Sequence, residues 1–240
     1  MLYLIGLGLN VDGISQYGLE TVKKCKKIYL ENYTVDFPYN EGALEAVLGK
    51  KIIPADREFV ESLEIIDEAQ TKNVALLIYG SPLTATTHIT LLEEAKKSGI
   101  RTKVIYNASV IDAVAETGLQ LYKFGKIASM PKWNKGKKFT PDSFMKVVHE
   151  NMSMKAHSLI LIDIGMEFQE ALDQLEIAAR NNHIPLNKMV VCQTLGTRGR
   201  RISYRTFEEF REFSNVKKPY CIVLPSKLHF VEKDSLEEFS

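Results

Sequence analysis

The chain has 240 residues, of which 45% are hydrophobic and 25% are charged. That composition supplies a sizeable buried core and excludes a disordered, collagen-like or disulfide-scaffold chain. The 31 Lys and Arg residues against 30 Asp and Glu residues give a formal net charge of +1. Because no global electrostatic field attracts a nucleic acid or an anionic membrane, we expect no membrane association and no direct nucleic-acid binding.

The cysteines and the first residues favour a cytoplasmic protein. Cys25, Cys192 and Cys221 are an odd number without CxxC spacing, and each lies in an apolar stretch. This pattern is typical of reduced cysteines in the core of a cytosolic protein. Gly6 comes too early for the apolar region of a signal peptide. No apolar run approaches the length of about 18 residues that a membrane-spanning helix needs.

In the first half of the chain, short apolar runs alternate with stretches of helical period. This alternation is typical of βα units around a mostly parallel sheet. The continuous apolarity of residues 74–79 predicts a central strand that is buried on both faces. We expect strands at residues 2–5, 28–31, 51–53, 74–79 and 103–106, and helices at residues 15–25, 41–48, 56–71 and 83–97.

The second half has a different texture, in which strands predominate beyond Gly118. We therefore expect an α/β fold of two α/β domains, residues 1–110 with a mostly parallel sheet and residues 111–240 with a mixed sheet. A helical stretch follows residue 109 and reaches Thr117. The remaining expected strands are residues 127–130, 158–164, 188–194, 201–204 and 220–224, and the expected helices are residues 141–154, 166–180 and 206–213.

Three loops are expected to line one crevice at the carboxyl ends of the first sheet's strands, where ligands of open α/β sheets bind. They are residues 6–9, 80–88 and 107–110. Residues 80–88 carry hydroxyls and no cation, which favours a neutral or cationic ligand over a polyphosphate. A helix that begins at Pro82 is the structural alternative. A nicotinamide site with Glu31 at the ribose is another, although the third glycine of GxGxxG falls on Val11.

Several short motifs match one protein family in order and spacing. The sequence resembles the diphthine synthases of the tetrapyrrole (corrin/porphyrin) methylase superfamily over nearly its whole length. The matching segments are residues 5–9, 31–34, 55–58, 80–88, 107–109, 118–125, 161–164 and 225–232.

The resemblance implies two α/β domains with S-adenosylmethionine bound in the cleft between them, and a homodimer. It implies an S-adenosylmethionine-dependent methyltransferase that methylates the amino group of a modified histidine, the diphthamide precursor, on translation elongation factor 2. The product would be diphthine. The alternatives are a methylase of the same fold that acts on a tetrapyrrole precursor, and a cofactor-binding homologue without catalytic activity.

The resemblance also implies roles for individual residues. Ser81 stands where the family usually has Asp, so a carboxylate is missing from the cofactor loop, and the C-terminal domain is shorter than is usual in the family. The substrate-facing candidates are Glu31, Tyr33 and Thr34, with His88 as a candidate proton acceptor. The family's cofactor contacts fall on Leu9, Ser81, Thr84, Ser109, Val110, Ile162, Leu195 and Tyr220.

The remaining charged and histidine residues give weaker indications. The other histidines show no ligand spacing, so we assign no metal. We expect catalysis by positioning, without an obligatory strong base. Two basic clusters could guide an acidic face of a protein substrate or lie in solvated loops. One comprises Lys132, Lys135, Lys137 and Lys138 around Trp133, and the other comprises Arg198, Arg200, Arg201 and Arg205.

Overall fold

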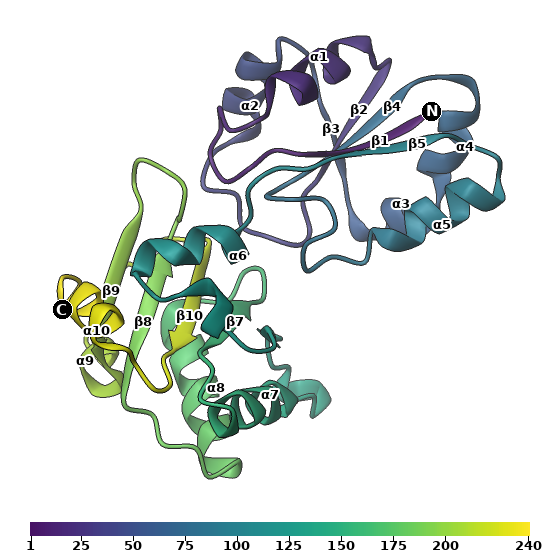
Figure 1. Cartoon of the computed structure of the whole chain (residues 1–240). Coiled ribbons are helices and arrows are strands. Elements are labelled where there is room, and N and C mark those ends of the chain that lie inside the picture. The colour runs from purple at the N-terminus through teal and green to yellow at the C-terminus, as the bar shows by residue number, and fades with distance from the viewer. The chain divides into compact units, whose positions relative to one another are not determined.

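The structure is a computed structural model that describes the whole chain apart from the side chain of Lys135. Two compact units, Met1–Val110 and Ile111–Ser240, make up the chain. Each unit contains one five-stranded sheet (Figure 1). The sheet of the first unit is parallel and that of the second is mixed, so the predicted fold class is confirmed.

The first sheet has the strand order β3-β2-β4-β1-β5. The predicted central strand, β4, lies in the middle, and all of its residues are buried. Such an apolar strand needs helices on both faces of the sheet, and Figure 1 shows α1 and α2 on one side and α3, α4 and α5 on the other. The strands are β1 (Leu2–Gly6), β2 (Lys27–Glu31), β3 (Ile53–Ala55), β4 (Val74–Ile78) and β5 (Thr102–Ile105).

The helices of the first unit begin at side chains that cap them. Ser15 accepts a hydrogen bond from the backbone of Gly18 at 3.1 Å, and Asn40 accepts one from Ala43 at 2.8 Å. The helices are α1 (Gln16–Lys24), α2 (Glu41–Leu48), α3 (Arg57–Glu61), α4 (Glu64–Thr71) and α5 (Ile89–Lys97).

Three predicted boundaries in this unit are wrong. The short strand predicted at residues 51–53 is Ile53–Ala55. The helix predicted over residues 56–71 is broken at Leu63, whose φ of 68° is left-handed. The helix predicted over residues 83–97 begins only at Ile89, because Thr86 and His88 hydrogen-bond the carbonyl of Pro82 and Ala85 has a φ of 55°. Side-chain bonds of this kind compete with the helical backbone bonds.

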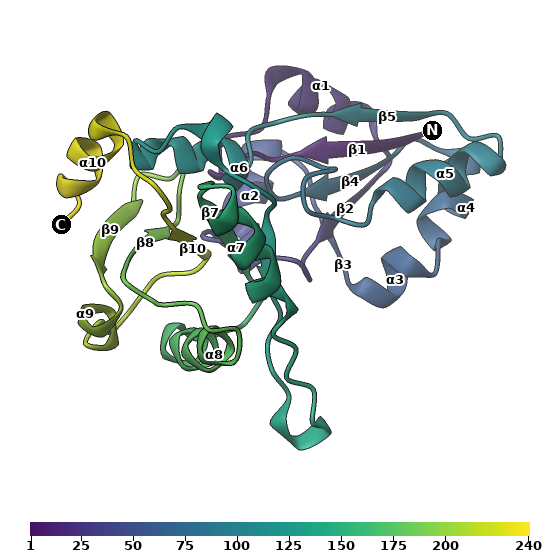
Figure 2. The same ribbon diagram turned by 60° about the horizontal axis from the view of Figure 1, so that its bottom comes forward.

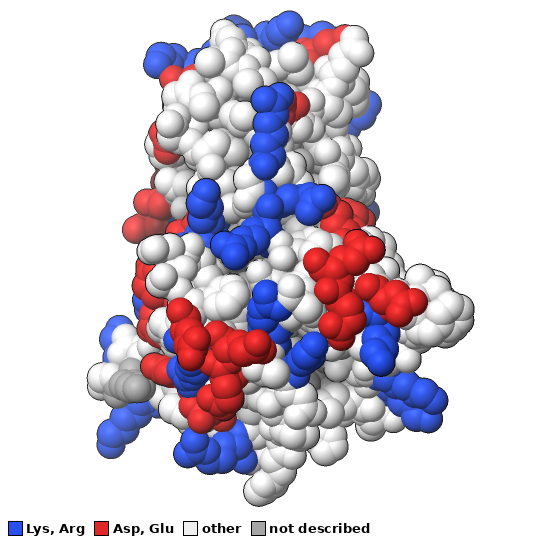
Figure 3. Space-filling model, turned by 90° about the vertical axis from the view of Figure 1, so that its left-hand side faces the viewer, with Lys and Arg blue, Asp and Glu red and all other residues white. Residues whose placement is uncertain are grey.

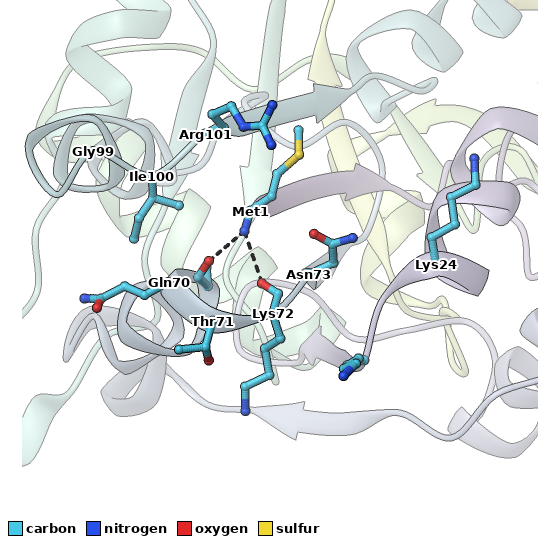
Figure 4. Close-up of a pocket in the computed structure, with 11 residues that line it drawn as sticks. Met1, Lys24, Gln70, Thr71, Lys72, Asn73, Gly99, Ile100 and Arg101 are labelled. Carbon is cyan, nitrogen blue, oxygen red and sulfur yellow. Dashed lines mark hydrogen bonds between the residues drawn. The ribbon is translucent and has the colours of Figure 1, made fainter.

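A polar cavity of about 470 Å³ lies at the amino ends of the strands of this first sheet. Figure 4 shows the Met1 amine there, with hydrogen bonds to the carbonyls of Ala69 at 2.6 Å and Lys72 at 3.1 Å. Helices α1, α4 and α5 end beside this cavity, so the negative ends of three helix dipoles gather there. The cations that line it, Lys24, Lys26, Lys72 and Arg101, oppose those dipoles.

The second sheet has the strand order β6-β7-β10-β8-β9, with only β6 and β7 parallel. Figure 2 shows α8 and α9 along one face of this sheet, where their side chains share one apolar core with those of α7. The strands are β6 (Ala128–Met130), β7 (Ser158–Ile162), β8 (Lys188–Gln193), β9 (Arg201–Thr206) and β10 (Tyr220–Leu224). The helices are α6 (Val110–Ala113), α7 (Ser143–Ser153), α8 (Phe168–Asn181), α9 (Phe207–Arg211) and α10 (Phe230–Glu237), with short 3-10 turns between them.

Helix α10 was not predicted from the sequence, and a buried glutamate holds its start. The Glu232 carboxylate accepts hydrogen bonds from the backbone of His229 at 2.7 Å and of Gln120 at 3.0 Å. It also pairs with Lys123 and lies 3.1 Å from Nε2 of His157. These bonds lower the pKa of Glu232 to about 2 although burial opposes them. The ionised carboxylate therefore joins residues 118–125 to the last helix.

Candidate functional site

Two glycine-containing loops are joined by backbone hydrogen bonds at the carboxyl edge of the first sheet. The N–H of Gly8 donates to the carbonyl of Gly80 at 3.1 Å, and the N–H of Gly80 donates to that of Gly8 at 2.9 Å. Both residues have a φ near 70°, which favours glycine. A Cβ at Gly6 would lie 2.6 Å from the Gly80 carbonyl oxygen, so this position also requires glycine. The GxG motif therefore allows one loop to pack on the other.

Asn107 attaches the third loop to the first. Its side-chain nitrogen donates to the carbonyls of Gly6 at 3.0 Å and Gly13 at 2.9 Å, and its side-chain oxygen accepts from the backbone of Ala108 at 2.8 Å. Residues 6–9, 80–88 and 107–110 therefore gather at one edge of the sheet, as predicted. The carboxyl ends of β1, β4 and β5 bring these loops together.

Five of the proposed cofactor residues lie on these three loops. Leu9, Ser81 and Ser109 are almost completely buried, and Thr84 and Val110 are half-buried. The Leu9 carbonyl accepts a hydrogen bond from the Tyr79 hydroxyl at 3.1 Å, and the Ser81 carbonyl accepts one from the backbone of Thr84 at 3.1 Å.

The other three proposed cofactor residues lie at one edge of the second sheet. Ile162 ends β7, Leu195 follows β8, and Tyr220 begins the antiparallel strand β10 between them. Tyr220 is paired with Gln193 in the sheet, and its hydroxyl donates to the Met166 carbonyl at 3.2 Å. The structure thus groups these eight residues as five in the first unit and three in the second.

Two of the proposed substrate-facing residues are in contact and almost fully buried. Nε2 of His88 lies 3.6 Å from a carboxylate oxygen of Glu31, and the exposed fractions of the two residues are 2% and 1%. Nδ1 of His88 lies 3.1 Å from the Pro82 carbonyl oxygen. Burial raises the pKa of Glu31, and the neighbouring His88 opposes that shift. The chain thus brings the end of β2 and the start of α5 together through this pair.

The other two substrate-facing candidates are closer to solvent. The ring of Tyr33 lies 5.1 Å from the Arg57 guanidinium, and burial raises the pKa of the Tyr33 hydroxyl to about 12. Thr34 is exposed. Tyr33 and His88 also line a cavity of about 230 Å³, with Thr87 and others. Because its pKa is raised to about 12, the Tyr33 hydroxyl is disfavoured as a proton-transfer group at neutral pH.

The first basic cluster lies on the hairpin between β6 and α7, which projects in Figure 2. Lys132 forms an ion pair with Glu170 at 3.0 Å, and the Trp133 indole donates to the carbonyl of Pro141 at 2.8 Å. Lys137 and Lys138 are exposed, and the side chain of Lys135 lies outside the described residues. Part of this cluster is thus neutralised by the protein itself.

The second basic cluster is also partly paired. Arg200 forms an ion pair with Glu116 at 2.6 Å, and the Arg201 guanidinium lies 5.9 Å from the Phe213 ring. On the face in Figure 3, several Lys and Arg side chains lie next to one another in the upper half, whereas Asp and Glu side chains lie among Lys and Arg side chains in the lower half. Within the described part of the chain, no three His, Cys, Asp or Glu side chains are arranged to hold a metal ion. No helix in that part is long and apolar enough to cross a membrane.

The three loops at the first sheet's carboxyl edge suit a neutral or positively charged ligand. Residues 6–9, 80–88 and 107–110 contain no Lys or Arg. They offer hydroxyls, backbone groups and apolar side chains. A cationic sulfonium and a nucleoside fit that chemistry, whereas a polyphosphate would call for the cations of a P-loop.

Comparison with known proteins identifies the class. The family described as Tetrapyrrole (Corrin/Porphyrin) Methylases matches residues 1–210, and the chain belongs to this family. Its members use S-adenosylmethionine as the methyl donor, so the chain is an S-adenosylmethionine-dependent methyltransferase. The loops at the carboxyl edge fit that cofactor in charge and chemistry.

Individual relatives carry names that are more specific than the description of the family. Diphthine methyl ester synthase 2 of Candida albicans is 36% identical over 269 residues, covering 100% of this chain and 89% of that protein. The human diphthine methyl ester synthase is 42% identical over 196 residues, covering 80% of this chain and 67% of that protein. The crystal structure of a diphthine synthase superposes with a TM-score of 0.90 at 30% identity, covering 100% of this chain and 95% of that one. The relatives' names include a methyl ester, which the sequence alone did not suggest.

Proposed function

We propose that the chain methylates the modified histidine of translation elongation factor 2 during diphthamide biosynthesis. One acceptor is the amino nitrogen, which gives diphthine. The second is a carboxylate oxygen of the same side chain, which gives the methyl ester in the relatives' names. The similarity to diphthine methyl ester synthases over 100% of the chain carries this proposal.

The two acceptors make different demands on the protein. S-adenosylmethionine supplies a methyl group on a sulfonium, which any well-placed nucleophile can accept. An amine with a pKa near 8 must first lose a proton, which costs about 1.4 kcal/mol at pH 7. A carboxylate is already ionised at that pH. Orientation contributes about 7 to 11 kcal/mol, far more than the deprotonation costs, so we assign catalysis mainly to positioning.

The residues that do the positioning are proposed from their places in the fold. In the first unit, Leu9, Ser81, Thr84, Ser109 and Val110 lie at one sheet edge and are assigned to cofactor binding. At the corresponding edge of the second unit, Ile162, Leu195 and Tyr220 have the same assignment. Tyr33 and Thr34 are assigned to the substrate.

The alternatives have less support. A methylase of tetrapyrrole precursors would share the family and the fold, but the curated relatives named above are diphthine methyl ester synthases. A cofactor-binding homologue without activity rests on Ser81 in place of the family's usual Asp. The proposed homodimer follows the family resemblance. The proposed cytoplasmic location is supported by the three buried free cysteines, which suit a reducing compartment.

Methyl transfer to the purified elongation factor tests the proposal. The factor is isolated from cells that lack the methylation step, and the modified peptide is analysed by mass spectrometry after incubation with S-adenosylmethionine. We expect methyl groups on the amine and one that mild alkali removes, because alkali cleaves esters but not N-methyl bonds. A tetrapyrrole precursor serves as the competing substrate. Transfer to that precursor alone would contradict the proposal.

A further inference from the structure

Glu31 and His88 form an isolated polar pair inside the first unit. Glu31 ends β2, and His88 directly precedes α5. Among the described residues, no hydrogen bond of good geometry reaches either Glu31 carboxylate oxygen or Nε2 of His88, although the Thr34 hydroxyl lies close enough to favour the Glu31 carboxylate. The 3.6 Å approach between Nε2 and a Glu31 carboxylate oxygen is the ion-pair contact between the two buried side chains. Buried polar atoms without such a contact are costly, so the pair requires an explanation.

The partner of Nδ1 fixes where the protons lie. The Pro82 carbonyl can only accept a hydrogen bond, so Nδ1 of His88 carries a hydrogen at this 3.1 Å contact. Nε2 then faces the Glu31 carboxyl group. Either a protonated Glu31 donates to neutral His88, or protonated His88 donates to the Glu31 carboxylate. Both arrangements hold one proton between the two side chains and carry no net charge.

Adding or removing a proton would leave a net charge in the core. A second proton would create a buried cation, and loss of the shared one would create a buried anion facing a lone pair. The nearby charged groups do not compensate for the second proton. Arg57 favours the Glu31 carboxylate, as does the Thr34 hydroxyl. Glu61 and Glu94, which line the cavity beside His88, already pair with Arg57 at 3.5 Å and Lys97 at 2.5 Å.

The same histidine fixes the shape of the cofactor loop. His88 and Thr86 both bind the Pro82 carbonyl, at 3.1 Å and 2.7 Å, and the backbone of Thr84 donates to the Ser81 carbonyl at 3.1 Å. Glu31 holds the other side of the His88 ring. A change at Glu31 is therefore transmitted to residues 81–88 through His88.

We propose that Glu31 and His88 are positioning residues, a neutral buried pair that holds residues 81–88 in place for the cofactor and takes no proton from the substrate. This inference rests on the proposed cofactor role of Ser81 and Thr84. It replaces the expectation that His88 is the proton acceptor. The reacting amine then loses its proton to solvent or to the substrate's own carboxylate.

Two substitutions of Glu31 separate this role from a catalytic one. In Glu31→Gln, the amide N–H can donate to Nε2 of neutral His88, so the pair stays intact and uncharged. In Glu31→Ala, that partner is lost. Calorimetric titration with S-adenosylhomocysteine should show an affinity about tenfold lower for Glu31→Ala and within about threefold of wild type for Glu31→Gln. Glu94→Gln, on the wall of the same cavity but in α5 outside the loop, is the matched control with unchanged affinity.

Turnover and hydrogen exchange decide the remaining outcomes. Loss of kcat in Glu31→Gln with wild-type cofactor affinity would make Glu31 a catalytic carboxylate and overturn the inference. Wild-type affinity in Glu31→Ala would also overturn it. Amide exchange of residues 81–88 needs no cofactor, and faster exchange in folded Glu31→Ala is expected. If the wild-type chain binds no S-adenosylhomocysteine, the proposed function fails, while the exchange result still tests the pair.

The protonation state is measurable in the unaltered protein. With ¹⁵N-labelled histidine, the His88 ring should show a protonated Nδ1 at neutral pH, because the Pro82 carbonyl beside it can only accept a hydrogen bond. His88→Asn identifies the signal, because the asparagine amide can still donate to Pro82. A His88 ring without a hydrogen on Nδ1 would contradict the inference, and this measurement does not depend on whether Glu31→Ala folds.

Discussion

The two ends of the first sheet use charge in opposite ways. At the amino ends of the strands, four basic side chains and the Met1 amine surround a cavity where three helices finish. At the carboxyl ends, the three loops contain no Lys or Arg, and glycines and Asn107 join them through the backbone. Helix carbonyls attract the cations at the first end. A basic cavity in a βα unit can thus be explained by its own helices, whereas the neutral end leaves room for a ligand.

Gly6→Val is expected to have the largest effect of any change at the carboxyl end. Its Cβ would lie 2.6 Å from the Gly80 carbonyl oxygen and 3.0 Å from the ring of Pro82, so the first two loops would separate. We expect no detectable S-adenosylhomocysteine binding by calorimetry. Gly99→Ala, at the amino end, is the control, because a Cβ there meets nothing within 4 Å. Its φ of 68° should cost about 1 kcal/mol of stability and leave affinity unchanged. Equal affinity losses in both variants would remove the distinction between the two ends.

Glu232 in the second unit is an ionised carboxylate that serves as a reference for Glu31, whose pair with His88 carries no net charge. Its pKa of about 2 lies below the unfolded value, so its stabilising contribution is present above about pH 4.5 and disappears as pH falls towards 2. Glu232→Gln should lower the free energy of unfolding by about 3 kcal/mol at pH 7, with the difference shrinking in acid. Burial raises the pKa of Glu31, so its contribution to stability falls as pH rises above about 4.5, the opposite of the trend for Glu232. The stability of Glu31→Gln relative to the wild type should therefore increase over that range. Urea unfolding at a series of pH values measures the stability difference between each variant and the wild type. If the two differences change with pH in the same direction, the proposed contrast between Glu232 and Glu31 is wrong.

Asn107→Ala tests the link between the first and third loops. The substitution removes hydrogen bonds to the carbonyls of Gly6 and Gly13, so we expect a loss of about 2 kcal/mol in unfolding free energy. Cofactor affinity should fall as well, because Ser109 loses its anchor two residues away. Asn73→Ala, beside the cavity at the amino end, is the matched control for affinity. Unaltered affinity in Asn107→Ala would mean that cofactor binding does not need the hydrogen bonds between the first and third loops.

Charge removal at the amino end is expected to have the smallest effect. Lys24→Gln with Lys26→Gln removes two cations near the end of α1, each worth about 0.3 to 1 kcal/mol through the helix dipole. The loss should diminish at high salt, because salt screens this interaction. Cofactor affinity should not change, and a marked decrease would mean that the basic cavity is part of the binding site.

The sequence predicted most of what depends on local pattern. The continuous apolar run of β4 gave the central strand, and the glycines of residues 6–8 gave the turn that packs on Gly80. The sequence did not predict features that depend on bonds between side chains and the backbone, such as the late start of α5 after His88 and helix α10, whose start the Glu232 carboxylate caps. The gathering of the three loops was predicted, but the contact between the side chains of Glu31 and His88 was not.

The pairing of Glu31 with His88 shows why a contact between distant side chains is difficult to predict from sequence motifs. Both residues were candidates from the sequence, but each was considered alone as facing a substrate. Only the parallel pairing of β2 with β4 brings the end of one segment to the loop of the other. Their burial, which decides their protonation, is a property of that packing and not of either motif.

Calorimetric titration of the purified chain with S-adenosylhomocysteine, with NAD as the control, tests most directly that the neutral end of the first sheet is the cofactor site. We expect saturable binding of S-adenosylhomocysteine and none of NAD, with binding lost in Gly6→Val and kept in Gly99→Ala. Absence of binding in the wild-type chain, or full binding in Gly6→Val, would contradict that assignment.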